Sequence, residues 1–116
     1  MQESLLANIS QLEGGLKIVP TGRECSVPSG RIDILASDEQ GKRVVIELKA
    51  GTADRDAVGQ VLSYMGDLKA AEPKVSVRGL LVAADFTARA IAAARAVPNL
   101  GLRKYAFKFS FHKVGM

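Results

Sequence analysis

The chain has few of the residues that mark secreted proteins or metal-cluster proteins. It has 116 residues, with one cysteine and one histidine. Because Cys25 is alone, no internal disulfide can form, and we expect a reducing, cytoplasmic setting. His112 has no second histidine and no further cysteine to join it, so it predicts no zinc site.

Long apolar runs are also absent. No run approaches the roughly 18 residues that a membrane-spanning helix needs, and the N-terminus lacks the basic start of a secretory signal. The sequence shows no internal repeat, low-complexity tract or linker. We therefore expect no membrane contact and a single small domain over residues 1–116.

The charge of the chain is moderately basic. Its formal net charge is +4 and its isoelectric point is near 9.5. From Lys69 onward, lysine and arginine clearly outnumber aspartate and glutamate. Such an excess permits a polyanionic partner without proving one.

The hydrophobic pattern predicts alternating helices and strands. A helical pattern at 3–13 ends at Gly14 and Gly15. Proline and glycine turns separate two short strand candidates from a pair of longer ones. The expected elements are a helix at 3–13, strands at 16–19, 23–27, 30–36 and 44–51, a helix at 53–71, a strand at 75–84, a helix at 87–97 and a strand at 101–114. This order favours an α/β three-layer fold with a mixed central sheet flanked by helices.

Two acidic residues lie in the adjacent apolar strands 30–36 and 44–51. If residues 39–41 close a hairpin between these strands, Asp33 lies opposite Glu47. Lys49 follows Glu47 by two residues and therefore points to the same face. Two opposed carboxylates repel one another and cost free energy if desolvated, and a bound divalent cation would remove that cost.

These residue types suit a hard cation. Asp33 and Glu47 offer carboxylate oxygens, and the backbone carbonyl of Leu48 could add another ligand for Mg²⁺ or Mn²⁺. Lys49 would orient or deprotonate an attacking water, or neutralise charge on a phosphate. The structural alternative is a weak Glu47–Lys49 salt bridge on a solvated strand.

The neighbourhood of this pair carries a family resemblance. The string Gly-Arg-Ile-Asp-Ile-Leu-Ala-Ser-Asp is followed by Val-Val-Ile-Glu-Leu-Lys-Ala-Gly and then by Gln60 and Tyr64 on a helix. This order resembles the PD-(D/E)XK nucleases of restriction-endonuclease-like fold, and residues 22–66 resemble the catalytic domain of NucS/EndoMS-type endonucleases. Those enzymes have a further N-terminal DNA-binding domain that these residues do not supply.

The resemblance implies roles for further residues. It implies that Glu13 is an outer or occasional metal ligand, although Glu13 could equally be a polar residue at a helix end. It implies that Gln60 hydrogen-bonds within the site or to DNA, with Tyr64 supporting it, and the alternative is a helix flank against the sheet. Arg31 shares the face of Asp33 and could contact phosphate or remain a surface arginine.

The last expected strand has two distinct faces. Tyr105, Phe107, Phe109 and Phe111 alternate with Lys104, Lys108 and His112. The aromatic face predicts either a strand that packs on the core or a strand that forms an interface with a second copy or with DNA.

Taken together, the residues and the resemblance predict a small Mg²⁺- or Mn²⁺-dependent DNA endonuclease that acts in DNA repair or processing. We expect a homodimer, which would place two sites on the two strands of a duplex. Alternatives are a dimer like the Holliday-junction resolvases, a non-catalytic DNA-binding or assembly module, and an α/β protein with an unrelated small ligand.

Overall fold

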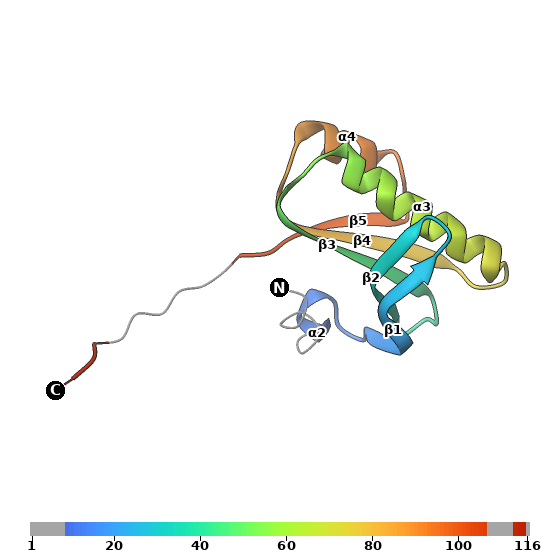
Figure 1. The fold of residues 1–116 in the computed structure, drawn as a ribbon, viewed down its shortest axis with the longest axis horizontal. Coiled ribbons are helices and arrows are strands. Elements are labelled where there is room, and N and C mark those ends of the chain that lie inside the picture. Colours follow the sequence, from blue (N-terminus) through green and yellow to red (C-terminus); the bar gives the residue numbers. More distant parts are fainter. Residues whose placement is uncertain (1–8, 107–112, 116) are drawn as a thin grey trace.

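The computed structural model describes residues 9–106 and 113–115. Its centre is a sheet of five strands in the order β1-β2-β3-β4-β5, shown in Figure 1. Antiparallel pairing joins the first three strands and parallel pairing joins β3 to β4 and β4 to β5. The strands are β1 Lys17–Val27, β2 Gly30–Ser37, β3 Arg43–Ala53, β4 Val77–Phe86 and β5 Leu100–Lys104.

Helices cover both faces of this sheet (Figure 1). The long helix α3, Arg55–Ala71, and the shorter α4, Ala88–Arg95, pack on one face. The short helix α2, Ile9–Leu12, packs on the other. The predicted mixed sheet flanked by helices is therefore confirmed.

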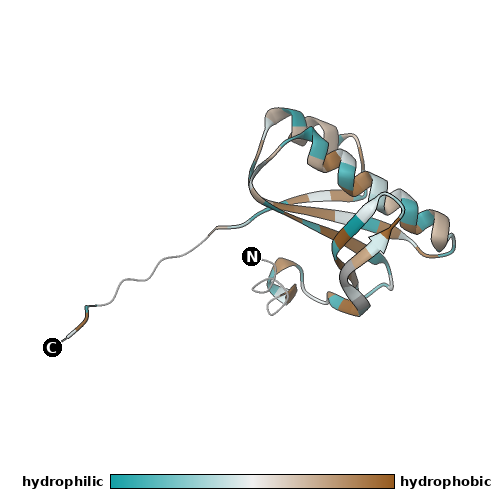
Figure 2. Ribbon diagram, viewed as in Figure 1, coloured by the Kyte–Doolittle hydropathy of each residue, from teal (hydrophilic) through white to brown (hydrophobic). Residues whose placement is uncertain are grey.

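Alternating side chains create a core on each face of the sheet. On β3, Val45 belongs to the core under α3 and α4, whereas Val44 and Ile46 belong to the core under α2. Figure 2 shows apolar segments along β3 and β4, in the sheet that α3 and α4 cover. This alternation fixes which strand residues face α3, and Glu47 and Lys49 follow Val45 on that side by the two-residue period.

The helix α3 forms where the sequence predicts it. Asp54 caps its first turn, since its side chain accepts a hydrogen bond from the Arg55 N–H at 2.8 Å. The apolar face of α3 packs on the sheet, with Leu62 partly buried. The buried residues of α3 are Ala57, Val58, Val61, Tyr64, Met65 and Leu68. Hence α3 is held firmly above the hairpin that carries Asp33 and Glu47.

Three elements differ most from the sequence expectation. The two short strands predicted at 16–19 and 23–27 are one strand, β1, whose register shifts between Ile18 and Arg23. A bulge there absorbs Pro20, which is why proline does not end the strand. The described part of the first helix is only Ile9–Leu12, and β5 ends at Lys104.

The aromatic face expected beyond β5 is only partly testable. Tyr105 lies against the core under α2, while Phe107, Lys108, Phe109, Phe111 and His112 fall outside the described residues. The prediction of a dimer or DNA interface at that segment therefore stays a prediction.

Within the described ranges, no helix is long and apolar enough to cross a membrane.

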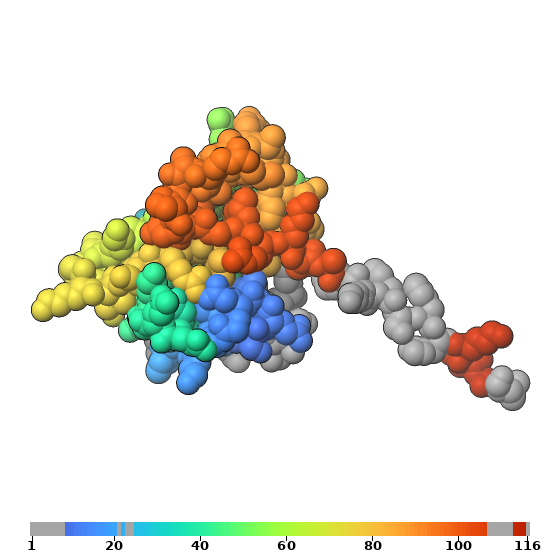
Figure 3. Space-filling model, turned by 180° about the vertical axis from the view of Figure 1, so that it is seen from behind, coloured from blue at the N-terminus to red at the C-terminus, as the bar shows by residue number. Residues whose placement is uncertain are grey.

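Figure 3 views the molecule from behind and shows the segment of α2 and β1 beside the turn that joins β2 to β3.

Candidate functional site

The β2–β3 hairpin has the predicted register. Main-chain pairs run from Ser37 opposite Arg43 to Ile34 opposite Ile46. The turn closes at Asp38, whose N–H donates to the Lys42 carbonyl at 3.0 Å. Continued by one residue, this register sets Asp33 opposite Glu47, as the sequence predicts.

Beyond Ile34 and Ile46, carboxylate oxygens replace main-chain carbonyls as the acceptors of hydrogen bonds between β2 and β3. The Asp33 N–H donates to Glu47 Oε1 at 2.9 Å, and the Leu48 N–H donates to Asp33 Oδ2 at 2.9 Å. Each acidic side chain is therefore held by a backbone donor of the opposite strand. The structure brings the predicted pair together and fixes the orientation of both groups.

The environment of Glu47 disfavours its negative charge. Its side chain is buried, with 7% of the residue exposed, and this burial raises its pKa to about 7 from 4.5. The charge of nearby Asp33 also raises the pKa, whereas the Asp33 N–H and the charge of Lys49 lower it. A half-buried Asp33 beside a buried Glu47 is thus a site that gains from an added positive charge.

Lys49 lies two residues beyond Glu47 and is exposed. A β-bulge follows it directly, because two residues of β3, Ala50 and Gly51, oppose one residue of β4. Gly51 has a φ of 106°, which an L side chain rarely adopts. This bulge interrupts the regular pairing of β3 with β4 directly after Lys49.

Gln60 and Tyr64 share a face of α3, as predicted. The Gln60 Nε2 donates to the Tyr64 hydroxyl at 2.9 Å. That hydroxyl lies over Gly30, where an added Cβ would come within 2.8 Å of it, and Gly30 has a φ of 151°. The pair therefore ties α3 to the first residue of β2, three residues before Asp33.

Arg31 is exposed near the start of β2, opposite Ser26 of β1. Its predicted contact with phosphate remains a prediction.

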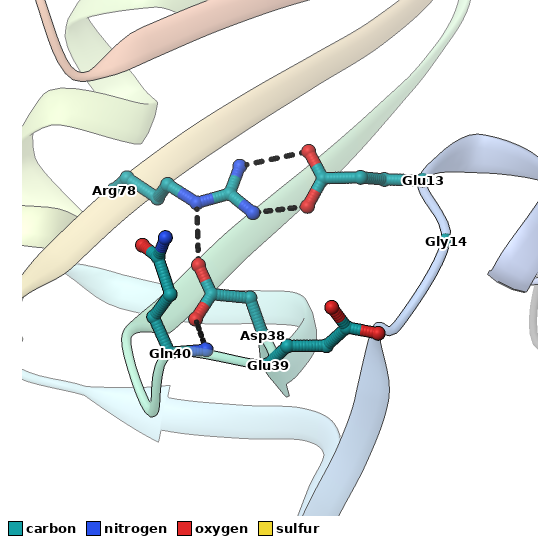
Figure 4. Close-up of a pocket in the computed structure, with 6 residues that line it drawn as sticks. All are labelled: Glu13, Gly14, Asp38, Glu39, Gln40 and Arg78. Atoms are coloured by element: carbon teal, nitrogen blue, oxygen red, sulfur yellow. Dashed lines mark hydrogen bonds and ion pairs between the residues drawn. The ribbon is translucent and has the colours of Figure 1, made fainter.

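Glu13 is not brought to the acidic pair. Its carboxylate accepts two hydrogen bonds from Arg78, one of them at 3.1 Å. Figure 4 shows this contact at a pocket lined by Glu13, Gly14, Asp38, Glu39, Gln40 and Arg78. Because Arg78 lies two residues before Leu80, which belongs to the core under α2, it shares that face of the sheet, opposite Glu47. The expected ligand role of Glu13 is not supported by this arrangement, since a partner on the other face holds its charge.

Arg78 is the site-related residue that sequence reasoning missed. Its Nε also donates to Asp38 Oδ2 at 3.1 Å, so it joins the end of α2, the hairpin turn and β4. The signal was an arginine inside the otherwise apolar run 77–83. A charged side chain in such a strand needs partners, and here it has two carboxylates.

The donor set at the pair fits a hard divalent cation. Two carboxylates and the nearby Leu48 carbonyl are oxygen ligands of the kind that Mg²⁺ and Mn²⁺ prefer, and Mg²⁺ commonly uses only one or two carboxylates. In the described part of the chain, no cluster of three or more histidine, cysteine, aspartate or glutamate side chains forms a further candidate. Asp33 and Glu47 are the carboxylates of this donor set that could hold such an ion.

Fold and site together define a mixed α/β domain with a paired-carboxylate site and a lysine beside it. The chain belongs to the family described as the Endonuclease NucS C-terminal domain, whose model matches residues 1–104.

Individual relatives agree with this assignment. Endonuclease NucS of Methanocaldococcus jannaschii is 38% identical over 87 residues, which cover 75% of this chain and 32% of that protein. Endonuclease NucS of Pyrococcus furiosus is 40% identical over the same length and the same shares of each chain. This chain thus spans about a third of the curated relatives that it matches.

Solved structures resemble the whole described fold. A repair endonuclease from Pyrococcus abyssi superimposes with a TM-score of 0.79 at 34% identity, covering 89% of this chain and 44% of that chain. The structure of an EndoMS–dsDNA2 complex gives a TM-score of 0.79 at 33% identity, covering 89% and 41% of the two chains.

Proposed function

We propose that this protein is a metal-dependent DNA endonuclease of the PD-(D/E)XK type that acts in DNA repair or processing. The observation that carries the proposal is the Asp33–Glu47 pair, held by reciprocal backbone hydrogen bonds at 2.9 Å with Lys49 two residues along the same strand. Membership of a family named for an endonuclease, and the likeness to a solved EndoMS–dsDNA2 complex, support DNA as the substrate.

The chemistry follows from the side chains. Asp33 and Glu47 would hold Mg²⁺ or Mn²⁺, which supplies Lewis-acid stabilisation of negative charge on the scissile phosphate. The exposed ammonium group of Lys49 would orient an attacking water or neutralise the charge that develops in the transition state. The Gln60 amide, fixed by Tyr64, would hydrogen-bond within the site or to the DNA backbone, and the exposed Arg31 would contact phosphate.

We also propose that two copies act together. Each chain would bring one Asp33–Glu47 pair, so cleavage of both strands in one encounter would need a second copy of this pair with opposite polarity. A symmetric homodimer supplies it. Light scattering of the purified protein with and without duplex tests this, and a 1:1 complex that cuts both strands would contradict it.

A cleavage panel tests the activity. Labelled duplex, single-stranded, mismatched and four-way DNA are incubated with Mg²⁺ or Mn²⁺, beside Lys49→Ala and an EDTA control. We expect cleavage by the wild type to be lost with EDTA and in Lys49→Ala, while salt-sensitive binding of DNA remains. Binding without cleavage in any lane would instead identify a non-catalytic module. Selective cutting of the four-way substrate would point to the junction resolvases.

A further inference from the structure

A second, basic pocket lies at the amino end of β4, away from the acidic pair. Its volume is about 480 Å³. The β2–β3 turn, the end of α3 with its connection to β4, and the α4–β5 connection form its walls. Lys42, Lys69, Lys74 and Arg78 line it, and no acidic side chain of the described residues does.

The frame of the pocket is held by backbone contacts. The Asn99 side chain donates to the Val77 carbonyl at 3.0 Å, and the Gly79 N–H donates to the Asn99 carbonyl at 2.9 Å. On the other side, the Arg43 N–H donates to the Ser76 carbonyl at 2.9 Å. These bonds fix the two connections relative to β3 and β4, so the lysines surround a defined hollow.

Three of the four cationic side chains that line this pocket form no ion pair among the described residues. Arg78 is neutralised by Glu13 and Asp38 on the side toward α2, and nearby Glu72 pairs with Arg43 at 3.6 Å. Among the ion pairs of the described residues, none involves Lys42, Lys69 or Lys74. Three ammonium groups around one hollow repel each other and would gain from an anion between them.

We propose that this pocket binds the phosphodiester backbone of DNA at a distance from the acidic pair. Lys42 and Glu47 are five residues apart along the start of β3, which in a strand corresponds to roughly 17 Å. Successive phosphates of one strand advance about 3.4 Å along a duplex. The spacing along β3 therefore corresponds to about five phosphate steps of one DNA strand. The assignment of DNA rests on the proposed function.

A protection experiment tests the placement without any substitution. The protein is acetylated by an N-hydroxysuccinimide ester in EDTA, with and without a 20-base-pair duplex, and each lysine is followed by mass spectrometry. We expect DNA to protect Lys42, Lys69 and Lys74 several-fold, while the exposed Lys17 on β1 reacts equally in both samples. Unprotected pocket lysines would overturn the proposal.

Variants measure what the pocket contributes to binding. The pocket variant carries three substitutions that each remove one positive charge, and the control carries three equivalent substitutions at exposed residues elsewhere. The pocket variant is Lys42→Gln/Lys69→Gln/Lys74→Gln and the control is Lys17→Gln/Arg55→Gln/Arg95→Gln. Kd for the duplex is measured by fluorescence anisotropy over a range of salt concentrations, after circular dichroism has verified folding.

The pocket variant should raise Kd by about tenfold and lower the slope of log Kd against log salt by about 2–3, because it loses up to three phosphate contacts. The control should change the slope by less than about 1. If both variants lose the same affinity for DNA, the loss comes from net charge alone and the pocket proposal is wrong. If poly-glutamate protects the pocket lysines and the duplex does not, the occupant is an acidic peptide and the proposal is wrong.

The two proposals can fail separately. If the protein cleaves DNA with metal but DNA does not protect the pocket lysines, the nuclease proposal stands and the pocket proposal is wrong. If DNA protects the pocket lysines but the protein never cleaves, the pocket proposal stands and the nuclease proposal is wrong.

Discussion

Replacement of Glu47 by glutamine should stabilise the metal-free protein at alkaline pH. Glu47 is buried and its pKa is raised from 4.5 to about 7, first by burial and then by the charge of Asp33. Glutamine has nearly the same shape, its Oε1 can still accept from the Asp33 N–H, and it carries no charge to desolvate. The variant therefore keeps the hydrogen bond seen at 2.9 Å and removes the electrostatic cost.

The sign follows from linkage. Below pH 4.5, Glu47 is protonated in both the folded and the unfolded chain, so it imposes no penalty. As the pH rises from 4.5 to about 7, the unfolded chain gives up this proton while the folded chain keeps it, so the wild type loses stability over this window and the full loss is present above it. A rise of the pKa from 4.5 to about 7 corresponds to roughly 3 kcal/mol.

Urea unfolding followed by circular dichroism at pH 4.5 and pH 8, in EDTA, measures the difference. We expect Glu47→Gln and the wild type to have similar free energies of unfolding at pH 4.5, and the variant to be about 2–3 kcal/mol more stable at pH 8. Millimolar Mn²⁺ should then stabilise the wild type and leave the variant unchanged. If the variant is equally destabilised at both pH values, burial does not disfavour the charge of Glu47 and the reasoning is wrong.

Three further predictions use neighbouring residues. Gly51→Ala should lower cleavage far more than Gly41→Ala, because only Gly51 lies in the bulge after Lys49. Both glycines have a positive φ and open space for a Cβ, so Gly41→Ala is the matched control, and an equal loss of cleavage would contradict this prediction. Gly30→Ala should cost about 2–3 kcal/mol in urea unfolding, since its Cβ would meet the Tyr64 hydroxyl at 2.8 Å, and Tyr64→Phe in the same chain should restore part of it. Arg78→Met should cost about 1–3 kcal/mol by the same measurement, because two carboxylates lose their partner, and an unchanged midpoint would show that this network is dispensable.

Much of the hairpin was predictable from the sequence because its rules are local. The turn at residues 39–41 sets the register, and a period of two then places Asp33, Glu47 and Lys49 relative to one another. The helix α3 is predictable for a similar reason, because the spacing of its apolar residues is a short local pattern.

The differences between the sequence expectation and the structure share a long-range cause. Proline at position 20 predicts a break, yet β1 continues because β2 supplies its hydrogen bonds around a bulge. Glu13 has a carboxylate of the right kind, but whether it joins a metal site depends on where α2 docks, and docking places it beside Arg78. No local pattern contains that information.

The sequence by itself determined the alternation of strands and helices and the pairing of the two acidic residues, because spacing along the chain controls which side chains share a face. Only the tertiary structure decided the depth of burial at Glu47, the partner of Glu13 and the meeting of Lys42, Lys69 and Lys74 around one pocket. Burial and charge balance depend on segments that are distant in sequence, so they exist only once the sheet has brought those segments together.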